Sequence, residues 1–197
     1  MDGKCEPSPC GADPPEKSIG FEGTTVLSPE GQVQLNKWYG KQKQKWLLCY
    51  KGSKDGFSAG QFHGKCDAYG TTVSVFRTTT ATVFGGYVDA SWAGNPAYKG
   101  SSSAWLFQLD KAAKMPASCN QQYAMYTANT YGPTFGGGHD LTIDSTMKKG
   151  TSNLGHSYQC PASPQPCSFG NDACKSYLAG SSNAWTLDEV EVFYPVP

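Results

Sequence analysis

His139, Asp140 and Asp144 lie close together in the sequence, directly after the glycine-rich segment 135–138 (FGGG). If the chain is extended there, residues 140, 142 and 144 share one face of a strand, so the two carboxylates can converge on one cation. Carboxylate and backbone carbonyl oxygens are the ligands that Ca²⁺ prefers. Asp140 and Asp144 are therefore a candidate calcium site, and His139 is a candidate binding residue beside it.

The competing interpretation of this segment needs no metal. Asp140 would cap the turn through local hydrogen bonds, and His139 would pack half-buried against an aromatic ring. Calcium sites usually collect more oxygen ligands than these two carboxylates provide. We therefore favour the turn and keep Ca²⁺ as an alternative.

His63 and Cys66 have the residue types of a catalytic dyad. Residues three apart on a helix share a face, which would bring an imidazole beside a thiol. The spacing is common by chance, however, and a cysteine in a cysteine-rich secreted chain is more often bonded than free. We expect Cys66 to be disulfide-bonded.

The C-terminal segment offers paired carboxylates, which are the raw material of acid–base catalysis, at Asp188, Glu189 and Glu191. On a strand, residues 189 and 191 point to one face and residue 188 to the other. We expect a solvated strand edge, or a structural link to Lys54 or Arg77, rather than an active site. No catalytic residues are predicted, and the chain is not expected to be an enzyme.

Trp92 lies in the polar segment 89–96 (DASWAGNP). A large ring in a polar loop can stack on a ligand or anchor a partner, so Trp92 is a second candidate binding residue. Core packing is the alternative, because a two-sheet domain needs large inward side chains.

Eight cysteines in loops rich in Pro, Ser and Gly favour a disulfide framework, which is typical of oxidising compartments. The preferred pairs are Cys49 with Cys66 and Cys5 with Cys10. Two further bridges would join Cys119 and the cysteines of segment 159–176, which are Cys160, Cys167 and Cys174. Other connectivities stay open, since spacing alone does not fix pairing.

The charge pattern excludes some classes of partner. The 16 basic and 16 acidic residues give a formal net charge of zero, and they are scattered singly apart from 41–45 (KQKQK). Such a surface has no broad basic face for nucleic acid or anionic lipid. No segment approaches the ~20 apolar residues of a membrane-spanning helix. We expect no nucleic-acid partner and no transmembrane segment.

The start of the chain, residues 1–4 (MDGK), lacks the apolar region of a signal peptide. The cysteines indicate an oxidising compartment instead. We resolve this conflict by expecting that a signal peptide was removed and that Met1 was supplied for expression. The protein is then secreted or extracellular.

The residue pattern predicts a mainly β (α+β) fold, a single-domain, two-sheet antiparallel β-sandwich with flanking short helices. Residues 1–20, rich in Pro and Cys, should form an irregular N-terminal arm before the domain at 21–197. Ser28-Pro29 is a helix-start signal, and a second short helix is expected over 58–66. Strands are predicted at 46–50, 71–79, 82–88, 104–109, 123–126, 141–144, 177–179 and 190–194.

Two glycine clusters, 85–86 and 136–138, could be taken for phosphate-binding loops. Neither is followed by the helix or the Lys-Ser/Thr pair that such a loop requires. Glycines also permit positive φ and close backbone approach. We expect turns or bulges of a sheet.

Four ordered segments resemble the TLDc domain: 54–58 (KDGFS), followed by Phe62, His63 and 66–67 (CD); 83–87 (VFGGY); 135–141 (FGGGHDL); and 187–193 (LDEVEVF). This family is named for proteins linked to oxidation resistance and for regulators of the vacuolar proton pump. The resemblance implies a β-sandwich with flanking helices and no established catalytic residues. Segment 132–140 is similar to extracellular, invertebrate-type members, and the cysteine-rich insertion 159–176 departs from the usual pattern.

These observations predict a non-enzymatic, secreted binding or structural module. It would act through an extracellular protein, glycan or matrix, or through self-assembly. One alternative is a calcium-dependent lectin-like domain that uses Asp140, Asp144 and Trp92. Another is a redox-active or oxidation-protective protein, which would need a free thiol of low pKa.

Overall fold

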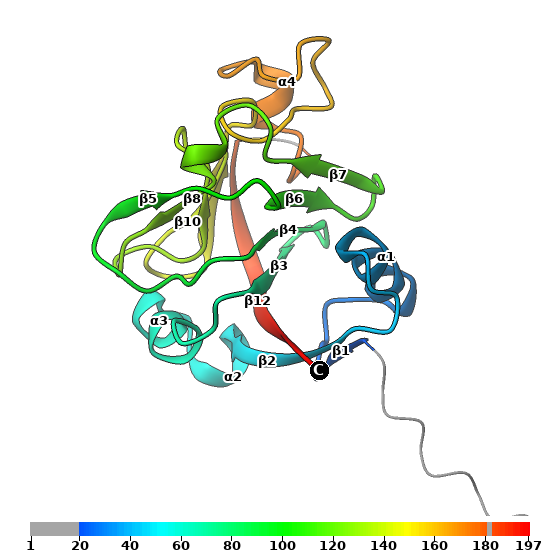
Figure 1. The fold of residues 1–197 in the computed structure, drawn as a ribbon, viewed down its shortest axis with the longest axis vertical. Helices are drawn as coiled ribbons and strands as arrows, with labels where there is room; N and C mark the ends of the chain where they lie inside the picture. The colour runs from blue at the N-terminus through cyan, green and yellow to red at the C-terminus, as the bar shows by residue number, and fades with distance from the viewer. Residues whose placement is uncertain (1–19, 181–182) are drawn as a thin grey trace, which may run out of the picture.

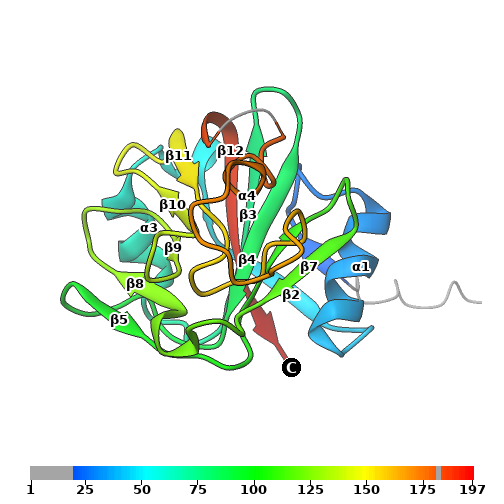
Figure 2. The same cartoon turned by 90° about the horizontal axis from the view of Figure 1, so that it is seen from above.

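The long C-terminal strand β12 (Ala184–Val196) connects the two sheets of the fold (Figures 1 and 2). The computed structural model describes residues 20–180 and 183–197. The start of β12 pairs with β11 (Lys149–Ser152), and the rest pairs with β2 (Lys45–Lys51) and β3 (Thr72–Thr78). The chain is one mainly antiparallel β domain with few short helices, as predicted.

Sheet A contains most of β12, and sheet B contains its first residues. The order in sheet A is β1 (Gly20–Glu22), β2, β12, β3, β4 (Val83–Val88), β6 (Trp105–Gln108) and β7 (Ala113–Pro116). The order in sheet B is β5 (Ala97–Lys99), β8 (Met125–Thr127), β9 (Thr134–Phe135), β10 (Leu141–Ile143), β11 and β12. Neighbouring strands in these two orders run antiparallel, except that β1 runs parallel to β2.

The helices are short and cover the margins of the sheets (Figure 1). Helix α1 (Pro29–Tyr39) begins as predicted, because the Ser28 hydroxyl accepts a hydrogen bond from the Gly31 backbone N–H at 3.1 Å. It ends at Gly40, whose φ of 88° suits glycine. The other helical segments are α2 (Gly52–Asp55), α3 (Ala59–Cys66), the 3₁₀ turn η1 (Gln121–Tyr123) and α4 (Asp172–Lys175).

Two hydrophobic clusters hold these elements together. Between the sheets, Phe76 and Phe84 of sheet A share a buried cluster with Phe135 of sheet B. On the opposite face of sheet A, Trp46 and Leu35 belong to a second cluster, which packs α1 against the sheet. Burial of these large side chains supplies most of the stabilisation of a sandwich.

A buried ion pair fastens the first residues of the domain to β12. The Glu191 carboxylate is fully buried and accepts a hydrogen bond from the Lys51 ammonium at 2.8 Å. It also accepts from the Thr25 backbone N–H at 2.8 Å and from the Thr24 hydroxyl at 2.6 Å. The segment after β1 is therefore held by one carboxylate of the central strand.

This arrangement corrects the expected role of the C-terminal carboxylates. β12 is paired on both sides, so Glu189 and Glu191 are buried residues of a central strand and not part of a solvated edge. The Asp188 carboxylate accepts from the Arg77 guanidinium at 2.8 Å, as expected, but Lys51 rather than Lys54 pairs with Glu191.

Three further expectations about local structure were wrong. Residues 85–86 lie inside β4, paired with β3, rather than in a turn. Gly85 permits the expected close backbone approach, since a Cβ there would overlap the Ser74 carbonyl oxygen. Residues 177–179 form a turn rather than a strand, since the Gly180 N–H donates to the Ser176 carbonyl. Gly20, expected in the N-terminal arm, belongs to β1.

The described disulfides confirm the predicted framework. Cys49 is bonded to Cys66, and two bridges join the remaining described cysteines, Cys119 to Cys167 and Cys160 to Cys174. The predicted Cys5–Cys10 pair and the arm that carries it lie outside the described residues. Within residues 20–180 and 183–197, no helix has the length and apolar character needed to cross a membrane.

Non-reducing peptide mapping checks these pairings. Proteolysis of the native protein is expected to yield peptides linked through Cys119–Cys167 and Cys160–Cys174, which separate on reduction, because each pair has Cα atoms within 5.7 Å. Recovery of Cys119 linked to Cys160 would contradict the framework. Cys49–Cys66, which lies far from the insertion in sequence, is the internal control.

Candidate binding site

Asp140 is a buried turn residue whose carboxylate organises the neighbouring loop. It accepts hydrogen bonds from the backbone N–H groups of four consecutive residues, 155–158, at 3.0–3.3 Å. Burial raises the pKa of Asp140 to about 6, and these N–H groups, which lower it, offset only part of that effect. A Cβ at Gly136 would overlap the Asp140 carboxylate, which explains one glycine of this turn.

Asp144 serves a different turn. Its Oδ1 accepts from the Thr146 hydroxyl at 2.6 Å and from the Thr146 backbone N–H at 3.0 Å. The structure thus gives Asp140 and Asp144 separate backbone partners. Residues 20–180 and 183–197 contain no group of three or more His, Cys, Asp or Glu arranged to hold a metal ion. Calcium binding stays an untested prediction.

Trp92 is a core residue, which corrects the suggestion that it is an exposed stacking platform. Its side chain is 1% exposed and packs edge-on against Phe62 and Phe135. The indole N–H donates to the Thr72 hydroxyl at 2.9 Å. The polar neighbours of Trp92 in the sequence suggested exposure. Its ring, however, contacts residues from other segments, Phe62 and Phe135.

The suspected dyad of His63 and Cys66 does not exist, because Cys66 is bonded to Cys49. His63 is buried, and its Nδ1 lies 2.8 Å from the Asp67 carboxylate. Its Nε2 lies 3.0 Å from the carbonyl oxygen of Tyr131. Both partners are acceptors, so the ring satisfies both only when each nitrogen carries a proton. His63 thereby links α3 to the loop that presents Tyr131.

His139 is half-buried, and its ring packs against Tyr126 and Tyr131 with centroids 5.8 and 6.1 Å away. Its φ of 55° places it in the left-handed region, at the tip of the glycine-rich turn. Burial lowers the pKa of His139 below its usual value, so the imidazole is neutral at neutral pH.

His139 lies at the end of a row of rings, here called the aromatic belt. Successive ring centroids along the row are 4.9–6.4 Å apart. Four of the rings are large side chains with exposed fractions of 37–48%. In order, the belt consists of Phe169, His156, Tyr123, Tyr98, Tyr126, Tyr131 and His139.

Sheet B and the loops beside it position the belt. Tyr126 alternates with the buried residues Met125 and Thr127 on β8, so its ring points away from the core. Tyr98 of β5 donates a hydrogen bond to the Gly137 carbonyl at 3.0 Å. The glycine-rich turn is small enough for the belt to lie against it, since a Cβ at Gly137 would overlap the Tyr123 side chain.

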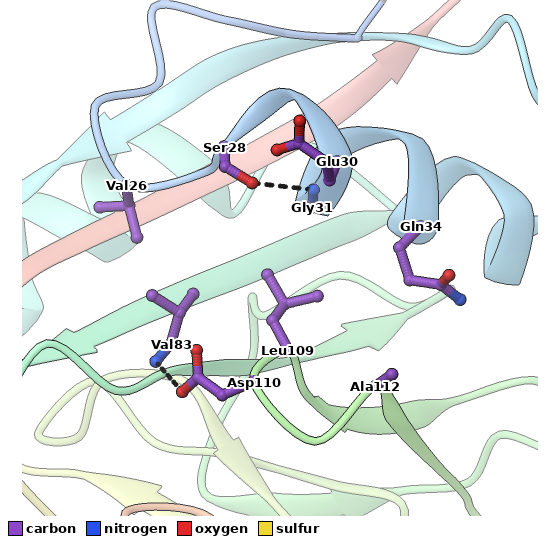
Figure 3. A pocket seen from close by; sticks show the side chains of 9 residues that line it. All are labelled: Val26, Ser28, Glu30, Gly31, Gln34, Val83, Leu109, Asp110 and Ala112. Atoms are coloured by element: carbon purple, nitrogen blue, oxygen red, sulfur yellow. Dashed lines mark hydrogen bonds between the residues drawn. The ribbon is translucent and has the colours of Figure 1, made fainter.

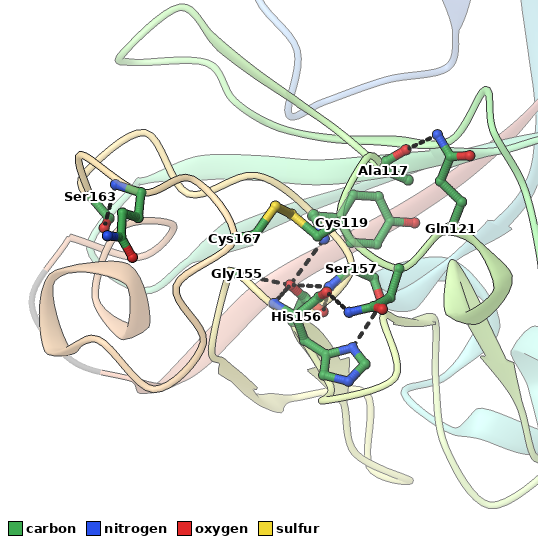
Figure 4. Close-up of a disulfide and its surroundings, with 12 residues drawn as sticks. Ala117, Cys119, Gln121, Gly155, His156, Ser157, Ser163 and Cys167 are labelled. Atoms are coloured by element: carbon green, nitrogen blue, oxygen red, sulfur yellow. Dashed lines mark hydrogen bonds between the residues drawn. A yellow bond between two sulfur atoms is a disulfide. The ribbon is translucent and has the colours of Figure 1, made fainter.

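The insertion 159–176 fixes the other end of the belt. Figure 4 shows the Cys119–Cys167 disulfide beside His156 and Ser157. The Cys119 N–H donates to the Ser157 carbonyl at 3.2 Å, which ties the bridge to the loop organised by Asp140. Phe169, two residues after Cys167, packs edge-on against His156 at 5.5 Å. The departure of this chain from the usual family pattern thus contributes a ring to the belt.

A cleft of about 530 Å³, here called the Trp185 cleft, adjoins the belt and shares Tyr131 and His139 with it. Its floor is formed by β10, β11 and the start of β12. Trp185 borders the cleft, but its ring turns toward the core: it covers Gly150, where a Cβ would overlap it, and packs edge-on against Phe84 at 4.9 Å. The remaining lining residues are Thr142, Asp144, Lys149, Thr151, Ala184 and Thr186.

A second cleft of about 360 Å³ lies between the start of α1 and the loops of sheet A (Figure 3). Glu30 and Asp110 line it, together with aliphatic residues such as Leu109. No aromatic ring lines it, and its carboxylates belong to a helix cap and a turn. The Trp185 cleft and the belt are therefore the better candidate site.

Sequence reasoning found His139 and Asp144 of this site and missed most of the rings. Tyr123, Tyr126 and Tyr131 recur within a polar stretch of the sequence. This recurrence is a local signal from which exposed rings could have been predicted. Tyr98 and Phe169 come from distant segments, and only the fold brings them to the same surface. The sequence gives no local signal that Trp185 packs over a glycine of the neighbouring strand and against Phe84.

The geometry defines a disulfide-bonded β-sandwich with a row of partly exposed aromatic rings on its surface. A family model for the TLDc domain matches residues 21–195, nearly the whole chain. The chain therefore belongs to the TLDc domain family, as its four ordered motifs indicated. A comparison with curated protein sequences finds no match.

Proposed function

We propose that this TLDc domain is a secreted, non-enzymatic binding module and that the aromatic belt contacts its extracellular ligand. The belt carries the proposal, because contiguous exposed rings are uncommon on a surface that only faces water. Rings provide large contact areas at a small cost in conformational entropy, which is why they are enriched at binding surfaces. A protein, glycan or matrix polymer is the expected ligand.

The disulfides support secretion. Three bridges are formed by the six described cysteines, and two of them fix the insertion that carries Phe169. Thiols are kept reduced in the cytosol, whereas oxidising compartments preserve such bridges.

The side chains that suggested chemistry support binding over catalysis. Cys66 is oxidised, so it provides no thiolate for a redox mechanism. Glu191 holds a buried ion pair, and Asp140 holds a backbone loop. Each of these groups therefore has a structural task.

Retention on immobilised ligands tests the proposal. The double variant Tyr98→Ser/Phe169→Ser removes two exposed rings, and we expect at least ten-fold weaker retention on whichever probe holds the wild type. The probes are cellulose, chitin, xylan, collagen and fibronectin. Val33→Ser is the control, because Val33 is an apolar residue on α1 that is more exposed than either ring and lies outside the belt.

Circular dichroism and melting temperature should be unchanged in all variants. No retention of the wild type on any probe, or an equal loss in the Val33 control, contradicts the proposal.

A further inference from the structure

We propose that the Cys119–Cys167 disulfide is a redox-sensitive switch whose reduction releases the Phe169 end of the aromatic belt and weakens ligand binding. This inference rests on the proposed function and concerns its regulation. Two bridges hold the cysteine-rich insertion in different ways. Cys160–Cys174 joins two points within the insertion, whereas Cys119–Cys167 ties its middle to the segment before η1 (Figure 4).

The Cys119–Cys167 bridge is more accessible than the other two described disulfides. Cys167 is exposed and Cys119 is partly buried. Each of the other two bridges includes at least one fully buried cysteine, and the fully buried ones are Cys66, Cys160 and Cys174. Thiol–disulfide exchange begins when a thiolate reaches one sulfur, so exposed bridges are the labile ones. A reductant should therefore open Cys119–Cys167 first.

The middle of the insertion, residues 161–170, depends on this bridge for its position. Within the described part of the chain, its hydrogen bonds join it only to itself and to Cys160. Phe169 packs edge-on against His156, with ring centroids 5.5 Å apart, but its side chain is 48% exposed. Once the bridge is open, only such partial ring packing keeps Phe169 against the belt, and we expect the ring to move away.

The remainder of the belt has contacts that do not involve the bridge. The His156 backbone N–H is held by the Asp140 carboxylate at 3.1 Å. The Tyr98 hydroxyl is held by the Gly137 carbonyl at 3.0 Å. Reduction should therefore remove one ring from the ligand-binding surface and leave the fold and the other rings in place.

The switching step is thiol–disulfide exchange with a dithiol, such as a protein that carries a Cys-x-x-Cys pair. One thiolate of the dithiol attacks the Cys167 sulfur and breaks the S–S bond, and Cys119 leaves as a thiolate that takes up a proton. The second thiolate of the dithiol then displaces Cys167 from the mixed disulfide. Two electrons and two protons pass to the bridge, and the dithiol becomes a disulfide. An oxidised partner of the same class reverses the step.

Alkylation after partial reduction tests the accessibility of the bridge. The native protein would be treated with a limiting amount of dithiothreitol, alkylated and mapped by mass spectrometry. We expect Cys119 and Cys167 to be labelled before the other described cysteines, which are internal controls in the same sample. These controls are Cys49, Cys66, Cys160 and Cys174.

Proton NMR of the imidazoles tests the release of Phe169 without any ligand. The chain has three histidines, so their Hε1 resonances are readily followed. We expect the His156 resonance to shift on selective reduction, because it loses the ring current of Phe169. His63 and His139 do not contact Phe169 and should keep their resonances. Phe169→Ser should give the same His156 shift without reduction.

Retention on a probe that holds the wild type measures the effect on binding. We expect selective reduction to weaken retention at least about three-fold, since one contacting ring is lost. Phe169→Ser is the matched control, because a protein that already lacks this ring should not weaken further on reduction. Cys119→Ser/Cys167→Ser should behave as the reduced wild type in oxidising and in reducing buffer.

Three results would overturn the switch: equal labelling of the six described cysteines, an unchanged His156 resonance, or unchanged wild-type retention after selective reduction. If Tyr98→Ser/Phe169→Ser weakens retention while reduction does not, the switch fails and the proposed function stands. No retention of the wild type on any probe contradicts both.

Discussion

Replacing Glu191 by glutamine is expected to lower the free energy of unfolding by about 3–5 kcal/mol, the usual cost of breaking a buried ion pair. The variant leaves the Lys51 ammonium buried without its counter-charge. It also turns an amide N–H₂ toward groups that donate, the Thr24 hydroxyl and the Thr25 N–H. Urea unfolding followed by tryptophan fluorescence, with disulfides intact, measures the loss.

A second ion pair on the same strand provides the control. Arg77 and Asp188 are also 2.8 Å apart, but their side chains are 31% and 43% exposed. Asp188→Asn should cost no more than about 1 kcal/mol, because water screens the pair. The double variant Lys51→Met/Glu191→Leu should recover much of the loss, since it removes both buried charges. Equal effects of Glu191→Gln and Asp188→Asn would contradict the assigned role.

These pairs also explain why the C-terminal motif LDEVEVF is rich in carboxylates without being an active site. Leu187, Val190 and Val192 point into the cluster between the sheets. Beyond a register shift between Leu187 and Glu189, Val190 and Val192 face this cluster, so both glutamates point to the opposite face of sheet A, where Glu191 pairs with Lys51. Simple alternation predicts that residues 189 and 191 share a face, but it does not predict which face is buried. The motif is therefore structural.

The parts of the fold that the sequence predicts well have local causes. Helix α1 follows from Ser28 and Pro29, whose capping and fixed φ act within one turn. Strands β2, β3 and β4 follow from apolar or alternating runs long enough to show their period. Strands β1, β5, β7, β9 and β11 are 2–4 residues long and exist because a remote partner pairs with them. Their sequences therefore carry little signal.

The candidate site also has parts with local causes, which the sequence predicts, and parts that depend on remote contacts, which it does not. The glycine-rich turn and its capping aspartate are local, and the sequence indicated both. Whether a ring is exposed depends on remote contacts, as Trp92 and Trp185 show. Trp92 follows polar residues and is buried, whereas Trp185 follows polar residues and lines a cleft. Composition cannot separate these two cases, because the deciding neighbours come from other strands.

Asp140→Ala is expected to destabilise the domain by at least about 3 kcal/mol at pH 7, because four backbone N–H groups lose a charged acceptor. Asp144→Ala, which removes the cap of an exposed turn, should cost about 1 kcal/mol and is the control for stability alone. The Asp140 variant should also lose ligand retention. Asp140 joins the glycine-rich turn, which carries His139, to the loop 155–158, which carries His156, and both rings belong to the belt. Thermal unfolding and retention on the wild-type probe measure the two effects.

The effect of Asp140 on stability should depend on pH in a defined direction. Its pKa is about 6 in the folded protein and near 3.8 in the unfolded chain, so the folded state binds the extra proton between these values. The contribution of this proton is complete below pH 3.8 and is lost as pH rises through 6. The free energy of unfolding of the wild type, relative to Asp140→Ala, should therefore fall by about 3 kcal/mol across that interval. A difference between the two proteins that stays constant or grows from pH 4 to pH 7 would show that the four N–H bonds outweigh burial and hold this carboxylate ionised.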